Sequence, residues 1–569
     1  MMVFIASSVF FFATETARTG GHQILGKLVK KEFRNWKNAL EVFAGHESKI
    51  QYNQLDLASK HRIEENRKRI LPIIDTIILY GRQCISLRGH RDSGPIDSDI
   101  DPIENDGNFK AILRSKLRYG DEILKLHLES MSKTATYLSA KTQNEIINAC
   151  GDIITKKIVN KIIEAKFFSI LADESTDISC IEQFSLYFCF YNSTTMKIEE
   201  NFLKFVPVTN LTGQSLANAL ITTLEGLNIN SNFMVGQGYD GSSSISGAFH
   251  GVQAYIRAKY SSAIYVHCAS YSLNLAISDA CTVPQVRNSM PTLSKLCNFF
   301  RTPKRQNVFA TEIEKTINID LSQAILLAKT VRNTLAEMRQ NAVQEFKKIF
   351  ETAQPSCEKY GVEISVPRVT SRQRKRDNVP HSTPEEYFRR TIFVPFVDSF
   401  ILHLDERLLS HDQILRSFAV IIPSENKNQE VNEVPLRQLY AAYEYLLDVE
   451  SFEIVLGEVK LWYTVWKENN ETPKTAMDAL AFLLQNNTKL FLKVEALLKI
   501  FVTIPVTTPS NERTFSTLRR LKTYLRNTTR ENRLNGLALL SIHREIPVSV
   551  DKVINLFPKQ KNRRLEFFL

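Results

Sequence analysis

Short apolar runs bounded by turn residues recur along residues 166–280. Two of them, 166–173 and 233–240, are rich in aromatic and branched side chains, and each ends in an aspartate, Asp173 or Asp240. This pattern predicts two buried strands that each deliver an acid at their end. If the two strands are neighbours, both carboxylates can bind one divalent metal ion, because such ions prefer hard oxygen donors.

Two further strands are predicted between these acids, at 183–191 and 197–208, on either side of the turn-forming residues 192–195. Consecutive strands with short links favour antiparallel hairpins. An amphipathic helix is predicted at 212–227, behind a Thr-Gly start. The leucines at helical spacing in this helix are Leu216, Leu220, Leu224 and Leu227.

The pattern continues with a predicted helix at 248–260, a strand at 263–268 and a helix that begins near Tyr271. The resulting order is three strands followed by helix, strand, helix, strand and helix. This is the element order of an RNase H-like domain, in which the first and fourth strands lie side by side. We therefore expect Asp173 and Asp240 to converge.

Four parts of the sequence carry a more specific resemblance, and they occur in the order of one family. They are similar to the core and the C-terminal dimerisation motif of hAT-superfamily transposases, and most similar to the transposon-derived zinc finger MYM-type and protein-kinase-inhibitor-repressor-like group. The resemblance covers most of residues 75–545. It implies an α/β fold with an RNase H-like mixed sheet interrupted by an α-helical insertion, with helical N- and C-terminal parts. The matching segments are 171–177, 238–242, 266–269 with 273–275, and 504–516.

The resemblance implies a third acid, Glu512, so that Asp173, Asp240 and Glu512 form the catalytic and metal-binding set. The implied reaction is DNA strand cleavage and transfer with Mg²⁺ or Mn²⁺, in which two ions flank the reacting phosphate. Each acid also has an ordinary structural interpretation. Both aspartates suit turns, and Asp173 also suits a helix N-cap. Glu512 follows Thr508 and Pro509, so the helix dipole alone accounts for it.

The charge distribution suits a polyanionic partner, and we expect that partner to be DNA in the nucleus. The 569 residues are 43% hydrophobic and 23% charged, with a net charge of +11 and a pI near 9.1. Basic clusters at 513–530 and 368–376 can neutralise phosphates without reading bases. Either cluster also suits a solvated face, and 368–376 also suits a nuclear-import signal. The predicted DNA-binding residues are Arg513, Arg519, Arg520, Lys522 and Arg526.

Zinc binding is not expected. The eight cysteines show no Cys-x-x-Cys spacing and are scattered, as reduced thiols of a cytosolic or nuclear protein are. His267 and Cys268 suit a neutral pair at a strand end, because Tyr271 stands where the similar proteins often carry a histidine. Residues 33–48 resemble the tail of a TTF-type zinc finger, but its upstream cysteines are missing, since Cys84 is the first.

The chain is longer than one ordinary domain. Its apolar stretch ending near Phe12 lacks a preceding basic region and is too short to span a bilayer, so neither secretion nor a membrane is expected. No small-molecule substrate is expected. The predicted divisions are a degenerate TTF-type zinc-finger remnant at 1–56, a helical region at 57–165, the first part of the RNase H-like core at 166–300, a shortened helical insertion at 301–470, and the dimerisation region completing the core at 471–550.

The largest departure from the family follows residues 299–305. The similar proteins continue through a Thr-Arg-Trp motif into a long helical insertion, whereas this chain has tryptophans only at Trp36, Trp462 and Trp466. Part of the insertion is therefore expected to be absent. The lost tryptophan belongs to the family's site for distorted DNA, where an unstacked base packs on an aromatic ring, and its loss argues against full transposition.

Leucine stripes at 476–501 and 530–544 suit a protein core or, given the resemblance, helices that pair in a homodimer or higher homo-oligomer. The leucines of these stripes are Leu480, Leu483, Leu484, Leu534, Leu537 and Leu540.

Three hypotheses on function remain open. They are a dimerising DNA- or protein-binding scaffold with impaired catalysis, an active Mg²⁺-dependent DNA transposase or nuclease, and a truncated product without an independent role. The lost tryptophan places the scaffold slightly ahead.

Overall fold

The structure is a computed structural model. It describes residues 39–567 except for several gaps, and of some helical stretches, among them 39–56, 321–327 and 509–513, it describes only the backbone. The longer gaps are 131–135, 240–250, 287–320, 367–378, 407–412, 424–429, 524–528 and 561–564.

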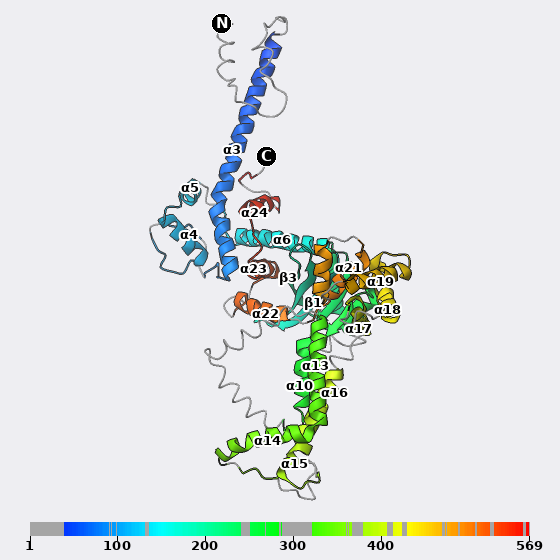
Figure 1. The fold of residues 1–569 in the computed structure, drawn as a ribbon. Coiled ribbons are helices and arrows are strands. Elements are labelled where there is room, and N and C mark those ends of the chain that lie inside the picture. The colour runs from blue at the N-terminus through cyan, green and yellow to red at the C-terminus, as the bar shows by residue number, and fades with distance from the viewer. Residues whose placement is uncertain are drawn as a thin grey trace.

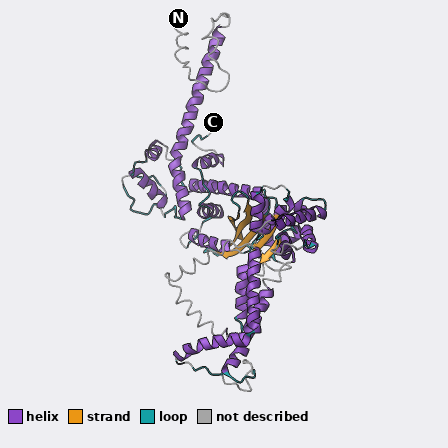
Figure 2. Ribbon diagram, viewed as in Figure 1, coloured by secondary structure: helices purple, strands orange, loops and turns teal. Residues whose placement is uncertain are grey.

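A five-stranded mixed sheet lies at the centre of the molecule (Figure 2). The strand order is β3-β2-β1-β4-β5; β1, β2 and β3 are antiparallel neighbours, whereas β1 and β4, and β4 and β5, are parallel. The predicted hairpins and the predicted adjacency of the first and fourth strands are therefore confirmed, as is the mixed α/β fold class. The strands are β1 (Phe168–Thr176), β2 (Glu182–Asn192), β3 (Lys197–Val208), β4 (Met234–Tyr239) and β5 (Ile264–His267).

The helices between the strands also follow the predicted order. Helix α7 (Gly213–Gly226) begins where the sequence indicated, because the hydroxyl of Thr212 accepts a hydrogen bond from the backbone N–H of Ser215. A short 3₁₀ turn, η2 (Ser231–Phe233), leads into β4. The remaining two helices are α9 (Val252–Lys259), between β4 and β5, and α10 (Ala269–Ala280), after β5.

The N-terminal part is helical, as predicted. Figure 1 shows α3 (Ala39–Gln83) projecting from the body of the molecule, with its C-terminal half packed beside α5 (Glu122–Ser130) and α6 (Ala140–Ala165). Helix α4 (Asn108–Arg118) lies next to them. The buried apolar face of α3 includes Ile70, Ile73, Ile74 and Ile77.

The first hydrophobic core joins this N-terminal part to the C-terminal end of the chain. Helix α23 (Glu531–Ile542) packs against α3, α6 and the edge strand β3. The side chain of Asn535 accepts from the backbone N–H of Phe205 at 2.7 Å and donates to its carbonyl at 3.0 Å. Helices α6 and α23 cross closely, since a Cβ built on Gly151 would lie 3.1 Å from the Cα of Gly536.

A second core lies against β4, β5 and the residue that precedes β1. Phe167, Val235 and Ile264 pack there with side chains of five helices between residues 413 and 503. This core spans residue 470, where a division was predicted. The leucine stripe at 476–501 is divided between two helices, α20 and α21, because α20 ends at the Asn-rich segment before Phe491. The helices are α17 (Gln413–Ser417), α18 (Glu433–Leu447), α19 (Phe452–Glu468), α20 (Ala476–Gln485) and α21 (Leu492–Thr503).

A helical arm extends from the sheet in the direction opposite to α3 (Figure 1). In it, α10 and α13 (Leu321–Gln340) both pack against α16 (Val394–Leu404), and α14 (Ala342–Lys359) lies beyond them with α15 (Pro384–Phe388). A small third core around Phe346 and Phe393 holds its far end. No helix among the described residues is both long and apolar enough to cross a membrane.

Candidate nucleic-acid interface and strand-end acids

Asp173 lies on β1, near the end of that strand, and is half-buried. Its Oδ1 accepts from the backbone N–H of Glu174 at 2.8 Å, and its carbonyl accepts from the hydroxyl of Ser185 at 3.2 Å. In the parallel pairing of β1 with β4, Leu171 is opposite Gly238. Asp240 lies outside the described residues, but both aspartates follow this pair by two positions in the sequence.

The segment 504–516 returns to these two strands from the C-terminal part of the chain. A Cβ built on Gly236 would lie 3.0 Å from the Cδ of Pro505, and one built on Gly238 would lie 2.9 Å from its Cγ. Pro505 therefore lies directly on β4, and only glycine leaves room for it there. The two strand glycines, which the sequence showed without a role, are explained by this contact.

Helix α22 (Pro509–Leu521) follows at once and packs against β1 and β2. It begins at Pro509, as the sequence predicted. Glu512 occupies its first turn, so the backbone of this acid belongs to a helix that lies beside the strand of Asp173. The side chain of Glu512 lies outside the described residues.

A buried ion pair fastens α22 to the end of β1. Lys522 donates to Asp177 Oδ2, and their side chains are only 3% and 0% exposed. Asp177 also accepts from Gln183 Nε2 at 2.8 Å and from the backbone N–H groups of Ser179 at 2.7 Å and Ile181 at 3.3 Å. Burial alone raises the pKa of Asp177, but these hydrogen bonds, led by that of Lys522, outweigh it and hold the pKa below its usual range.

The residues predicted to bind DNA occupy different environments. Arg519 and Arg520 are exposed on the last turn of α22, and Arg520 Nη2 donates to Thr517 Oγ1 at 3.0 Å. Lys522 does not share this exposed face, because its ammonium group is paired with Asp177 in the interior. The side chain of Arg513 and all of Arg526 lie outside the described residues.

The leucine stripes of the C-terminal region lie largely inside the chain. Leucines Leu480, Leu483, Leu534, Leu537 and Leu540 are buried, and Leu484 is partly buried. The interpretation as core residues therefore holds for these positions. Among the described residues of the same region, the large apolar side chains that are exposed are Leu490, at 72%, and Leu492, at 54%.

No group of three His, Cys, Asp or Glu side chains that could hold a metal ion occurs within the described part of the chain. The predicted set of acids is not tested by this, because only Asp173 has a described side chain. His267 and Cys268 are likewise outside the described side chains. The tryptophans Trp462 and Trp466 are buried in the second core, where Trp462 Nε1 donates to the carbonyl of Ile421 at 3.0 Å.

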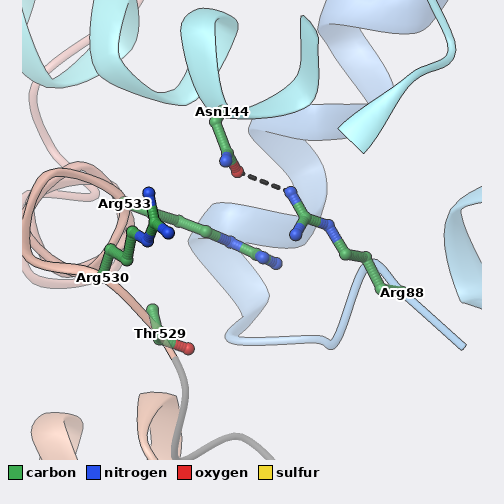
Figure 3. Close-up of a pocket in the computed structure, with 5 residues that line it drawn as sticks. All are labelled: Arg88, Asn144, Thr529, Arg530 and Arg533. Carbon is green, nitrogen blue, oxygen red and sulfur yellow. Dashed lines mark hydrogen bonds between the residues drawn. The ribbon is translucent and has the colours of Figure 1, made fainter. Parts of the chain in front are cut away.

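One arginine that sequence reasoning passed over lies in a cavity of the molecule. Arg88, just after α3, comes together with Arg530 and Arg533 at the start of α23, as Figure 3 shows. No local pattern reveals the cluster, because Arg88 is more than 400 residues from the other two arginines in the chain and meets them only through the packing of α23.

Comparisons with known proteins agree with this architecture. Residues 34–251 match the family model described as the ZMYM1/FAM200 RNase-like domain, and residues 463–546 match the hAT family C-terminal dimerisation region. The chain is 24% identical to the Homo sapiens protein named 52 kDa repressor of the inhibitor of the protein kinase, over 87% of this chain and 77% of that protein. It is 23% identical to the Mus musculus protein of the same name, over 88% and 78% respectively.

Proposed function

Because this chain belongs to the hAT transposase-derived proteins and carries their C-terminal dimerisation region, we propose that it binds DNA as a self-associated protein and that its strand-cleaving activity is impaired. The observation that carries the proposal is the position of α22. This helix is fixed beside β1 by a buried ion pair while Arg519 and Arg520 remain exposed on it. A rigid helix with exposed guanidinium groups next to the strand ends suits contact with a phosphate backbone.

The impairment of catalysis is supported by what the chain lacks relative to its relatives. The match to the Homo sapiens protein extends over 599 positions, which exceeds the 569 residues of this chain, so the relative carries residues that have no counterpart here. The tryptophans Trp462 and Trp466 are committed to the core and cannot stack on an unpaired base. Both of these relatives are named as repressors, and a nuclear protein that binds DNA without cutting it suits such a role.

The DNA-binding proposal is tested by fluorescence anisotropy with a labelled duplex. The variant Arg519→Gln/Arg520→Gln is expected to bind more weakly, and its salt dependence is expected to flatten by about 1 to 2 in the slope of log K against log salt. The matched control is Arg257→Gln/Arg416→Gln, which removes the same charge from exposed positions on α9 and α17. Equal loss in both variants, or no binding by the parent, contradicts the proposal.

The alternative function, an active metal-dependent nuclease, is favoured by the register of β1 and β4. If the pairing of Leu171 with Gly238 continues by two residues, Asp173 and Asp240 become direct neighbours. Glu512 on α22 would complete a set of carboxylates, and this donor set fits Mg²⁺ or Mn²⁺. A bound ion would supply charge stabilisation at the reacting phosphate, while the acids hold it and the strands keep the acids in place.

The two functions are separated by a cleavage assay with Mn²⁺ and supercoiled or terminal-repeat DNA. Under our proposal, the parent protein and the Asp173→Ala variant give the same background of nicking. Metal-dependent nicking that disappears in Asp173→Ala would establish the enzyme and refute the impairment. DNA binding measured on both proteins in the same preparation shows that each is folded and competent to bind.

A further inference from the structure

A basic pocket lies between the N-terminal part of the molecule and the start of α23, at some distance along the chain from the strand-end acids. Its volume is about 300 Å³. Figure 3 shows its side chains entering from three separate segments: the residues after α3, helix α6, and the residues that lead into α23. The lining residues are Arg88, Asn144, Thr529, Arg530 and Arg533.

One guanidinium group in this pocket is held in position by the protein. Arg88 Nη2 donates to the carbonyl of Ala140 at 2.8 Å and to Oδ1 of Asn144 at 2.7 Å. These bonds also orient the amide of Asn144 and leave its NH₂ group as a donor. The other edge of Arg88 includes a buried Nε that has no hydrogen-bond partner in the structure. The pocket is thus organised before a ligand arrives, which reduces the entropy lost on binding.

The charges around the pocket favour an anion. Three guanidinium groups line it, and none of its five described lining residues is acidic. Nearby acids include Asp92, which acts on the charge of Arg88, and Glu531, which lines an adjoining cavity with Arg530 and Arg533. Cations therefore outnumber these carboxylates. Burial lowers the pKa of Arg88, as expected for a guanidinium that is partly removed from water.

We propose that this pocket binds a phosphate group. A guanidinium fork matches two phosphate oxygens at once, and the amide of Asn144 supplies a further donor. The phosphate can belong to a DNA backbone or to a free phosphate anion, since both present the same oxygens. The DNA source rests on the proposed function, and it is consistent with the packing of α22, the helix of Arg519 and Arg520, against α23.

The test uses the full chain, the pocket variant Arg530→Gln/Arg533→Gln, and the charge-matched control Arg257→Gln/Arg416→Gln. Inorganic pyrophosphate is added in one arm, at ionic strength matched with chloride, and the melting temperature is read. A labelled duplex is titrated in the other arm at several salt concentrations. Circular dichroism checks the fold of each variant, and the exposed Arg530→Gln change alone replaces the pair if Arg533→Gln unfolds the protein.

If the pocket takes a free phosphate, pyrophosphate raises the melting temperature of the parent and the control but not of the pocket variant. If it takes a backbone phosphate, only the pocket variant loses DNA affinity, and its salt slope falls by about 1 to 2. The proposal is overturned if the pocket variant behaves as the control does in both arms. If the parent binds no DNA, the proposed function fails, and the pyrophosphate arm alone decides the pocket.

Discussion

Replacing Lys522 with methionine is expected to release α22 from the sheet. The change removes one member of a pair whose side chains are 3% and 0% exposed, and leaves the Asp177 carboxylate buried without its cation. Breaking a buried ion pair from one side costs about 3–5 kcal/mol. Asp177 keeps three other donors, from Gln183, Ser179 and Ile181, so we expect about 3 kcal/mol.

We expect this loss of stability to appear as local opening of α22. A single melting temperature would not isolate it, because the chain has more than one core and the temperature would average over them. Hydrogen exchange followed by mass spectrometry isolates the peptides of α22. A loss of about 3 kcal/mol corresponds to exchange roughly a hundredfold faster in Lys522→Met than in the parent. Exchange within about twofold of the parent would refute the reasoning that this pair fixes the helix.

The same measurement on a double variant, Lys522→Met with Asp177→Asn, tests whether the two side chains act as a pair. The neutral amide can exchange hydrogen bonds with Gln183, whose own Oε1 has no partner in the structure, and no charge is left buried. Most of the lost protection of α22 is therefore expected to return. Asp177→Asn alone leaves the Lys522 ammonium buried and is expected to be as damaging as Lys522→Met. Additive losses in the double variant would show that the two side chains act separately.

The same pair predicts a pH dependence. The pKa of Asp177 is lower in the folded protein than in the unfolded chain, so its contribution to stability is complete above the unfolded pKa of about 4 and is lost as the pH falls through the lower folded pKa. In Lys522→Met this acid-dependent loss becomes smaller. Denaturation measured between neutral pH and about pH 3 checks the sign.

Three further variants test packing and self-association. Gly536→Ala is expected to destabilise the protein by about 1–3 kcal/mol, because a Cβ there would lie 2.6 Å from an isoleucine of α6. Gly457→Ala is expected to stabilise it by up to about 1 kcal/mol, because the added methyl group meets open space in the middle of α19. Thermal unfolding compares the two variants. Leu490→Asp/Leu492→Asp is expected to shift the protein toward monomers in sedimentation, because these side chains are exposed in the dimerisation region. Leu402→Asp, on α16 and as exposed as Leu492, is the control. An unchanged oligomer in Leu490→Asp/Leu492→Asp would place the contact elsewhere.

The sequence predicted the sheet well because its signals are local. The strands at 183–191 and 197–208 were found within a residue of β2 and β3, since their apolar runs are bounded by turn residues. The start of α7 was found from Thr212, whose hydroxyl caps it. Asp173 was correctly placed on a strand, but β1 continues past it to Thr176, so the predicted end of this strand was three residues short.

What the sequence did not predict depends on contacts between distant parts of the chain. Lys522 was expected beside DNA because it lies within a basic cluster, but its partner Asp177 is 345 residues away. The break before α21 was missed because leucine spacing continues across it. Arg88 gave no signal, because the arginines of its pocket are assembled only when α23 packs against α6.

The contact between α23 and the sheet has a consequence for how the protein is made. The last described strand of the sheet ends at His267, whereas two of the helices that pack on the sheet, α21 and α23, end only at Thr503 and Ile542. At about 5–20 residues per second, a ribosome needs on the order of ten seconds or more to complete this interval. During that time the parts of the sheet that these two helices cover are exposed, so we expect this chain to depend on chaperones during its synthesis more than a protein folded from local contacts does.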